Sequence, residues 1–408
     1  MKYGLIGEKL GHSHSPRIHK LLGNAEYRLV PLSKKDLDLF MRSKDFAGIN
    51  VTIPYKKDVI PYCDFLSDEA REIGSVNTVI HRDGRLFGYN TDCFGLSELI
   101  RQTGVMLTEK KVIILGSGGT SLTAHYVAKQ QNAAEIVVVS RHGENNYGNI
   151  TAHHDADVII NTTPVGMYPN NGAAPIDLSL FGNLSGVTDV IYNPVRSALV
   201  IDAIDRGIPA SGGLAMLVYQ AAKAHQLFLS EKKSDLDNTN YVYNKILKEV
   251  SNIILIGMPG SGKTTIGKLL AKKMNRRFID TDHEIVKKEN KSIPEIFARD
   301  GEAYFRRIES DIISDICKCS GTVISVGGGG VLCPENRMAI RQNGIIIHIT
   351  RPVQLLGVEG RPLSKSSEAL SKMQSVRQPV YQELCDFEIE NIKPAEYAVD
   401  GIIRKIGI

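Results

Sequence analysis

The chain has 408 residues, 42% of them hydrophobic and 23% charged, with a net charge of +4. This length predicts roughly two or three domains, and so small a net charge gives no support to nucleic acid as a partner. Six cysteines without a CxxC pair favour a reducing compartment over a disulfide framework. No apolar run approaches the ~18 residues of a membrane span, and the apolar N-terminal stretch is too short for a signal peptide. We therefore expect a cytoplasmic protein that does not bind membranes.

Short apolar runs rich in β-branched residues alternate with segments of helical period through most of the sequence. This pattern predicts an α/β fold of parallel sheets with crossover helices. The clearest buried strands are expected at residues 111–116, 135–140, 157–162, 252–257, 322–327 and 344–350.

A glycine-rich turn, Gly116-Ser117-Gly118-Gly119, follows the first of these strands and precedes a helical run at residues 120–131. Glycines there permit a tight bend and close approach to a pyrophosphate, so the turn is a candidate dinucleotide site. A GxGG pattern without a third glycine fits a purely structural turn equally well. The next strand ends in Ser140-Arg141, and an arginine at this point suits the 2′-phosphate of NADP, whereas NAD-binding folds usually place an acid there.

Three other features of the sequence suggest sites that we do not predict. His12, His14 and His19 lack a further Cys, Asp or His at ligand spacing, so no metal is expected there. His153 and His154 are expected in an exposed loop. Cys317 and Cys319 are expected in a helix, where their side chains would not share a face, which argues against a redox pair.

A polar stretch without apolar period, residues 230–240, is predicted to be a linker, and residues 241–250 have helical spacing. A strand begins almost at once at residue 252, so the main domain boundary is expected near residue 250.

A phosphate-binding loop follows that strand. Residues 257–264, GMPGSGKT, fit GxxxxGK[ST] between a strand and a helix at 265–274. The glycines let backbone N–H groups converge on phosphate oxygens at the positive end of the helix. Lys263 is predicted to reach the β- and γ-phosphates of ATP, and the Thr264 hydroxyl to ligate Mg²⁺. Asp280 is the best candidate carboxylate for the Mg²⁺ shell, and Asp282 is expected to point the same way along an extended chain.

Residues 251–408 resemble shikimate kinases over nearly their whole length. The matching strings are FIDTD (278–282), GEAYFRRIE (301–309), the glycines at 327–330, RPL (361–363) and RQPVY (377–381). The resemblance implies a P-loop domain of the nucleoside-monophosphate-kinase type that phosphorylates shikimate with ATP. One departure from the family is that the lid segment at 355–360 is short and carries no basic residue before Arg361.

The resemblance also implies roles for single residues in this half. Asp282 would orient the attacking hydroxyl, and Arg306 and Arg377 would clamp the substrate carboxylate. Arg361, on a lid, would neutralise charge on the transferring phosphoryl group. The remaining shikimate-binding residues would be Gly327, Gly328 and Gly329, which let the backbone approach a ring. The ATP-binding residues would be Gly257, Pro259, Gly260, Ser261, Gly262, Lys263, Thr264, Thr265 and Arg361.

Residues 1–250 resemble shikimate dehydrogenases. The matching strings are HSHSP (12–16), GINVTIPYK (48–56), GSVNT (74–78), GYNTD (88–92), INTTPVGM (160–167), DVIYNP (189–194) and GGLAMLVYQ (212–220). The resemblance implies a two-lobed enzyme, with an α/β substrate lobe at about 1–104 and 213–250 and a Rossmann-like NADP lobe at about 105–212. Only nineteen residues separate Arg141 from Asn161, where the family normally has a longer stretch that contains a helix.

The dehydrogenase resemblance implies that Lys56 and Asp92 form the catalytic pair, because a lysine near the carbonyl oxygen can stabilise the alkoxide and deliver a proton. Ser13 and Ser15 would hold the substrate carboxylate. The ring would be bound by Thr52, Asn77, Asp92 and Gln220, with Tyr192 also in the substrate set. NADP would be bound by Gly116, Ser117, Gly118, Gly119, Thr120, Ser140, Arg141, Thr162, Gly213 and Met216.

The two resemblances together imply a bifunctional enzyme of aromatic amino-acid biosynthesis. It would reduce 3-dehydroshikimate with NADPH and phosphorylate the resulting shikimate with ATP and Mg²⁺. Its catalytic residues would be Lys56, Asp92, Lys263, Asp282 and Arg361. Two alternatives remain open. One half could be a metabolite-sensing or regulatory module, as the short lid and the trimmed NADP segment suggest, or the first half could oxidise quinate with NAD, against which Arg141 argues.

Overall fold

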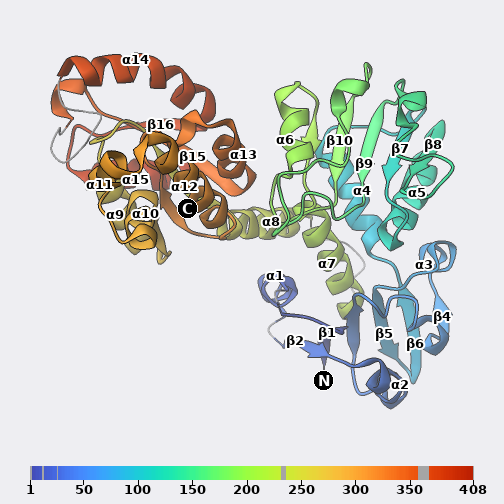
Figure 1. The fold of residues 1–408 in the computed structure, drawn as a ribbon. Coiled ribbons are helices and arrows are strands. Elements are labelled where there is room, and N and C mark those ends of the chain that lie inside the picture. Colours follow the sequence, from blue (N-terminus) through green and yellow to red (C-terminus); the bar gives the residue numbers. More distant parts are fainter. Residues whose placement is uncertain (1, 12, 25, 231–235, 357–366, 408) are drawn as a thin grey trace. The chain divides into compact units, whose positions relative to one another are not determined.

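The computed structural model describes residues 2–11, 13–24, 26–230, 236–356 and 367–407 (Figure 1). The chain divides into two compact units, Met1–Leu247 and Lys248–Ile408. No helix in these described ranges is long and apolar enough to cross a membrane. All six cysteines are free thiols.

The first unit begins with a six-stranded sheet in the order β2-β1-β3-β5-β6-β4. Its strands are β1 (Tyr3–Gly7), β2 (Tyr27–Pro31), β3 (Gly48–Val51), β4 (Phe65–Leu66), β5 (Thr78–Arg82) and β6 (Arg85–Tyr89). The pairs β3–β5 and β5–β6 are antiparallel, so the general expectation of parallel pairing is wrong for them. The β5–β6 pair is a hairpin closed at Asp83 and Gly84, both at positive φ, because an Asp-Gly pair favours a two-residue turn.

The second sheet of this unit is parallel throughout, in the order β11-β10-β9-β7-β8. Its strands are β7 (Lys111–Leu115), β8 (Glu135–Val139), β9 (Val158–Asn161), β10 (Gly186–Asp189) and β11 (Ala210–Ser211). The strands expected at residues 111–116, 135–140 and 157–162 are therefore present. The connection from β8 to β9 contains only a short 3-10 turn, η2 (Ile150–His153). Ile150 and Tyr147 pack into the core at this place, so two side chains cover the sheet where a crossover helix is absent.

The helices of the first unit are α1 (Ser15–Leu21), α2 (Lys34–Ser43), α3 (Asp68–Ile73), α4 (Asp92–Gln102), α5 (Gly119–Gln130), α6 (Ala198–Asp205) and α7 (Leu214–Leu229). Helices α4 and α7 approach each other closely at Gly95, where an added Cβ would lie 2.5 Å from the carbonyl oxygen of Met216. A larger residue would force the helices apart. This contact brings the start of α4, at Asp92, near Gln220 on α7.

The predicted linker is partly wrong, because helix α8 (Leu236–Val250) begins within it. Residues 231–235 lie outside the described residues. Thr239, Val242 and Ile246 are each at most 3% exposed, so the spacing of buried residues begins before residue 241. The helix expected at residues 241–250 is confirmed as the later part of α8.

The second unit has a parallel five-stranded sheet in the order β13-β14-β12-β15-β16. Its strands are β12 (Asn252–Ile256), β13 (Phe278–Asp280), β14 (Val323–Ser325), β15 (Gly344–Thr350) and β16 (Phe387–Glu390). Its helices are α9 (Lys263–Met274), α10 (Thr281–Glu289), α11 (Ile293–Arg299), α12 (Gly301–Ile316), α13 (Pro334–Asn343), α14 (Ser367–Leu384) and α15 (Ala395–Ile406). Helices α9 and α15 cover one face, and α12, α13 and α14 cover the other.

Two smaller expectations fail. Cys317 and Cys319 are not in a helix, because α12 ends at Ile316 and the chain turns there. His154 is exposed as expected, but His153 is half-buried and bonds Asn145 across 3.0 Å.

Candidate active sites

One cavity of about 360 Å³ in the first unit brings the predicted substrate residues together. Its walls come from the β1–α1 connection, the ends of β3, β5 and β6, and the start of α7. The predicted residues that line it are Ser13, Ser15, Thr52, Lys56, Asn77, Asp92, Tyr192 and Gln220. Three residues of the predicted NADP set, Thr120, Gly213 and Met216, line the same cavity.

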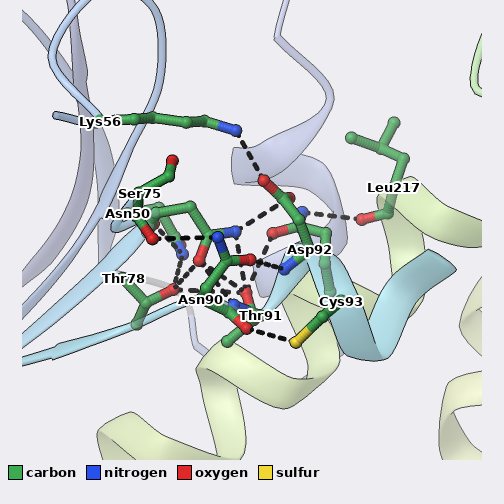
Figure 2. A network of polar contacts seen from close by, with 11 residues as sticks. Asn50, Lys56, Ser75, Thr78, Asn90, Thr91, Asp92, Cys93 and Leu217 are labelled. Atoms are coloured by element: carbon green, nitrogen blue, oxygen red, sulfur yellow. Dashed lines mark hydrogen bonds and ion pairs between the residues drawn. The ribbon is translucent and has the colours of Figure 1, made fainter. Parts of the chain in front are cut away.

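The charged centre of this cavity is the pair Lys56 and Asp92. Lys56 Nζ donates to Asp92 Oδ2 across 2.6 Å, and the two side chains are 29% and 16% exposed. Figure 2 shows the lysine reaching across to the carboxylate at the start of α4. Because both groups are half-buried, their attraction is screened less than that of a surface pair.

Asn77 fixes the other oxygen of the same carboxylate. Its Nδ2 donates to Asp92 Oδ1 across 2.9 Å, and its Oδ1 accepts from the backbone N–H of Thr91 across 2.7 Å. The backbone N–H of Asp92 in turn donates to Asn90 Oδ1. With both carboxylate oxygens bonded, Asp92 holds the Lys56 ammonium in a fixed position, as a proton donor requires.

Two buried polar residues of this network were not predicted. Asn50 donates to Thr78 Oγ1 across 3.0 Å and accepts from the Tyr27 hydroxyl across 2.7 Å. Thr91, 2% exposed, contacts Asn77. Asn50 lines the cavity and stands two residues before Thr52, so the alternation of side chains along a strand could have indicated it.

The dinucleotide candidates lie at the carboxyl ends of β7 and β8. Gly116 has φ 106°, and an added Cβ would lie 2.8 Å from the Thr162 hydroxyl, so only glycine fits there. That hydroxyl donates to the carbonyl of Leu115 and fixes the end of β7. Gly118 and Gly119 have open space around an added Cβ, and α5 starts at Gly119, so the positive end of a helix lies at this turn. The turn thus fits a pyrophosphate.

Ser140 and Arg141 follow β8 beside this turn. The register pairs Leu115 with Val139, and Gly116 N–H donates to the Val139 carbonyl. Ser140 N–H donates to the Asn145 carbonyl across 3.1 Å, which closes the loop tightly, and Arg141 is exposed. An exposed guanidinium next to a dinucleotide turn fits a 2′-phosphate.

The second unit contains a cavity of about 700 Å³ at the carboxyl end of its sheet. Most of the predicted kinase residues line it: Pro259, Gly260, Gly262, Lys263, Thr264, Thr265, Asp280, Asp282, Arg306, Gly327, Gly328, Gly329 and Arg377. Gly257 and Ser261 belong to the same loop but are buried behind it. The predicted lid residue Arg361 lies outside the described residues, as does most of the segment before it.

The phosphate-binding loop has the backbone that its glycines permit. Gly257, Gly260 and Gly262 have φ of 140°, 84° and 98°, a region that other residues rarely adopt. Lys263 Nζ donates to the carbonyls of Gly257 and Met258, so the ammonium lies across the loop where phosphates would be received.

The candidate magnesium ligands contact each other, since Thr264 Oγ1 donates to Asp280 Oδ2 across 2.6 Å. An adjacent hydroxyl and carboxylate fit a hard cation that prefers oxygen ligands. The prediction of an extended chain from Asp280 to Asp282 is wrong. Asp280 ends β13 and caps α10 by accepting from the N–H groups of Asp282 and His283, so Asp282 lies in a helical turn, though still on the cavity wall.

A buried glutamate holds one of the candidate substrate arginines. Arg306 Nη1 donates to Glu309 Oε2 across 2.7 Å, and the glutamate side chain is 2% exposed. Burial raises the pKa of Glu309, while Arg306 opposes that shift. Glu309 was not predicted, although it is the last residue of the GEAYFRRIE string. Arg351, which also lines the cavity, was not predicted either.

The glycine run is required by these side chains. An added Cβ on Gly327 would lie 2.5 Å from Asp282 Oδ1, and one on Gly329 would lie 2.4 Å from Arg306 Nη1. The carbonyl of Gly328 accepts from the Tyr381 hydroxyl across 2.6 Å. The glycines therefore make room for the charged groups of the site itself, which sequence reasoning had attributed to a substrate ring.

Comparisons with known proteins give a family match in each of the two units that contain these cavities. Residues 5–79 match the family "Shikimate dehydrogenase substrate binding domain", and residues 259–407 match the family "Shikimate kinase". A shikimate dehydrogenase (NADP⁺) of Clostridium beijerinckii is 34% identical over 255 residues, which span 58% of this chain and 93% of that one. One from Clostridium perfringens strain SM101 is 33% identical over 265 residues, 60% of this chain and 97% of that one.

Solved structures resemble the first unit as well. A chorismate mutase/shikimate 5-dehydrogenase fusion protein from Clostridium acetobutylicum is 35% identical with a TM-score of 0.56, over 60% of this chain and 96% of that one. A shikimate 5-dehydrogenase from Thermus thermophilus, in complex with NADP(H) and shikimate, is 26% identical with a TM-score of 0.54, over 60% of this chain and 99% of that one.

Proposed function

The chain belongs to the shikimate dehydrogenase family, and from this premise we propose how its two active sites work. It is a bifunctional enzyme that reduces 3-dehydroshikimate to shikimate and phosphorylates shikimate to shikimate 3-phosphate. Its cofactors are NADP(H), ATP and Mg²⁺. The comparisons give no support for a regulatory module or a quinate-specific enzyme.

The observation that carries the dehydrogenase assignment is the Lys56–Asp92 contact inside a cavity lined by every predicted substrate residue. NADPH supplies the hydride when bound. Lys56 donates its proton to the oxygen that gains negative charge at the reduced carbon, and the remaining amine is held by Asp92. Ser13 and Ser15 orient the substrate carboxylate, while Asn77 and Gln220 hold the ring hydroxyls.

In the second unit, ATP supplies the phosphoryl group when bound. Lys263 and the loop N–H groups bind phosphate oxygens, and Thr264 with Asp280 holds the Mg²⁺ shell. Arg306 and Arg377 clamp the carboxylate of shikimate. Asp282 accepts a hydrogen bond from the attacking hydroxyl and orients it for in-line transfer. The lid role of Arg361 stays a prediction.

The test of the dehydrogenase proposal is the variant Lys56→Ala, with Lys57→Ala as a matched control. Lys57 is the exposed neighbour and does not line the cavity. Loss of the proton donor should lower kcat for reduction by about 10²- to 10⁴-fold, while kinase kcat for added shikimate stays unchanged. The proposal fails if Lys56→Ala and Lys57→Ala reduce 3-dehydroshikimate at the same rate.

The matching test of the kinase proposal is Asp282→Asn. Purified protein is incubated with 3-dehydroshikimate, NADPH, ATP and Mg²⁺, and the products are identified by mass spectrometry. The wild type should yield shikimate 3-phosphate, whereas Asp282→Asn should consume NADPH and accumulate shikimate. Accumulation of the phosphate at the wild-type rate by Asp282→Asn would contradict the assigned role.

Cofactor preference, location and partners complete the proposal. Arg141 should favour NADP⁺ over NAD⁺, and Arg141→Ala should raise the KM for NADP⁺ with little effect on that for NAD⁺. A cytoplasmic location agrees with six free thiols. The proposed partners are the small-molecule substrates alone, without nucleic acid or membrane.

A further inference from the structure

A second group of metal-ligand side chains lies in the kinase unit, apart from Thr264 and Asp280. His348 offers a ring nitrogen, Cys385 its sulfur and Glu388 a carboxylate oxygen, and these three atoms all lie within 4.8 Å of one another. His348 Nδ1 and Glu388 Oε1 are 2.8 Å apart. Such spacing allows one ion to contact all three atoms.

Ordered backbone positions each of the three ligands. His348 on β15 and Glu388 on β16 are direct partners in a parallel strand pair. Cys385 follows the end of α14, and its N–H donates to the Tyr381 carbonyl across 3.0 Å. The adjoining Asp386 bonds Ile346 twice, through its N–H and through its carboxylate. Ligands on strands and at a tied helix end are held more precisely than ligands on a free loop.

We propose that His348, Cys385 and Glu388 form a binding site for a divalent ion of the zinc class. Zn²⁺ binds the nitrogen, sulfur and oxygen ligands offered here, commonly with three protein groups and one open position. Mg²⁺ prefers oxygen ligands alone, so this set differs in kind from the nucleotide-associated magnesium site. On binding, the thiol proton of Cys385 passes to solvent, and the proton that His348 Nδ1 shares with Glu388 moves to Nε2 of the same ring. The ion then forms bonds to the sulfur, to Nδ1 and to one oxygen of Glu388.

The surroundings fit an ion with one open coordination position. His348 is 1% exposed, so its ring is held in the core and can turn little. Glu388 is 44% exposed at its side chain and gives the ion a path from solvent. A cavity of about 200 Å³ lies against His348, and its polar lining includes Arg351, Gln378 and Glu390.

The site also lies directly behind the phosphate-binding loop. Cδ2 of His348 would be 3.3 Å from a Cβ added to Gly257. Its ring lies 4.9 Å from that of Tyr381, whose hydroxyl bonds the carbonyl of Gly328. An ion on Nδ1 would therefore fix the imidazole between the first glycine of the loop and the glycine run.

The test uses the full chain, reduced, stripped with a chelator and titrated with Zn²⁺ against a chromophoric competitor. The ligand variants are Cys385→Ser and Glu388→Gln, since replacement of buried His348 could disturb the core. The matched controls are Cys319→Ser, another half-buried thiol, and Glu396→Gln, an exposed glutamate of α15 that lines neither cavity of this unit. Unchanged far-ultraviolet circular dichroism and dehydrogenase activity show that each variant is folded.

We expect the wild type and both controls to bind one tight Zn²⁺ that Cys385→Ser lacks, and Glu388→Gln to bind it at least ~10-fold more weakly. Titration with Co²⁺ should give a thiolate-to-metal absorption band in the near ultraviolet that disappears only in Cys385→Ser. The proposal is overturned if Cys385→Ser binds Zn²⁺ as tightly and in the same number as the wild type. It is equally overturned if the Co²⁺ band persists in that variant.

Discussion

His19 on α1 makes the first unit sensitive to acid. Its side chain is 0% exposed and stacks on Tyr27 with ring centroids 3.9 Å apart and planes 9° from parallel. Phe228 lies 5.8 Å away on α7. Neither ring nitrogen meets a partner in good hydrogen-bond geometry among the described residues, and Asn50 favours the protonated ring only in part. A proton added to this ring would therefore place a poorly compensated charge in the core.

The size of the effect follows from the pKa of the buried ring. Burial, and then the nearby His225, lowers the pKa of His19 from 6.5 to about 3. Below pH 6.5 the unfolded chain therefore binds a proton that the folded chain rejects, so stability is full above this pH and falls as pH drops toward 3. At pH 5.0 the loss amounts to about 2 kcal/mol.

Other buried groups titrate in the same range, so the comparison needs a variant. Burial raises the pKa of Asp189 from 3.8 to about 6, and this group acts in the opposite direction, because the folded state keeps a proton that the unfolded state loses. His19→Phe retains an aromatic ring against Tyr27 and removes the titrating group. The difference between wild type and variant thus isolates His19.

The assay is urea unfolding at pH 7.5 and pH 5.0, followed by circular dichroism. The transition of the first unit is identified by hydrogen exchange of β1 and mass spectrometry. We expect the wild type to lose about 2 kcal/mol more than His19→Phe on passing from pH 7.5 to pH 5.0. Equal losses in the two proteins would refute the account, since they would mean that His19 is protonated in the folded state or partly exposed.

Three further outcomes are expected. Gly329→Ala should displace the Arg306 guanidinium, which lies 2.4 Å from the position of the new Cβ. Loss of a charged hydrogen bond, worth about 1.5–3 kcal/mol, should raise the kinase KM for shikimate roughly 10- to 100-fold. The kinetics of the dehydrogenase reaction should not change. Ser197→Ala removes a 2.6 Å hydrogen bond to buried Asp189, so urea unfolding should show the first unit destabilised by about 1–3 kcal/mol. Raising the salt concentration from 0.1 to 1 M shortens the Debye length from about 10 to about 3 Å. Steady-state assays should therefore show a larger rise in the KM for shikimate in the kinase reaction than in the NADP⁺-dependent oxidation of shikimate.

The parallel strands of the core could be predicted from the sequence because they are buried on both faces. Such strands appear as continuous apolar runs, and all six expected runs contain a strand. The phosphate-binding loop could be predicted equally well, since its glycines, lysine and threonine act through local backbone geometry. Both cases depend on interactions within a few residues of sequence.

Features that depend on distant partners could not be read in the same way. Asn50 and Glu309 are polar side chains whose burial is tolerated because they are hydrogen-bonded, Asn50 to Tyr27 and Thr78 and Glu309 to Arg306. Those contacts form only in the fold. The antiparallel hairpin does have a local signal, the Asp83-Gly84 pair itself. At Asp280 two local signals compete, because the apolar run before it predicts a strand while its own side chain favours a helix N-cap, and the cap ends the strand before Asp282.

We propose that both cavities bind shikimate, but the charged side chains that line them differ. In the first cavity the cations are Lys9 and Lys56, the anion is Asp92, and hydroxyl and amide groups make up much of the remaining polar wall. The uncharged hydroxyl and amide groups are sufficient to bind the substrate carboxylate there, because the nicotinamide end of the cofactor brings no anion to the reacting carbon.

In the second cavity the cations are Lys263, Arg306, Arg351 and Arg377, and the anions are Asp280, Asp282 and Glu309. In the binding mode proposed above, the carboxylate of shikimate would approach a polyphosphate, and like charges repel at close range. The two arginines proposed to bind that carboxylate would offset the repulsion, whereas hydroxyl groups could not. The buried Glu309 then keeps Arg306 in place before substrate arrives, at the cost of part of its positive charge. Because salt screens charges but leaves neutral hydrogen bonds largely unaffected, the KM for shikimate should depend more on salt at the kinase site than at the dehydrogenase site.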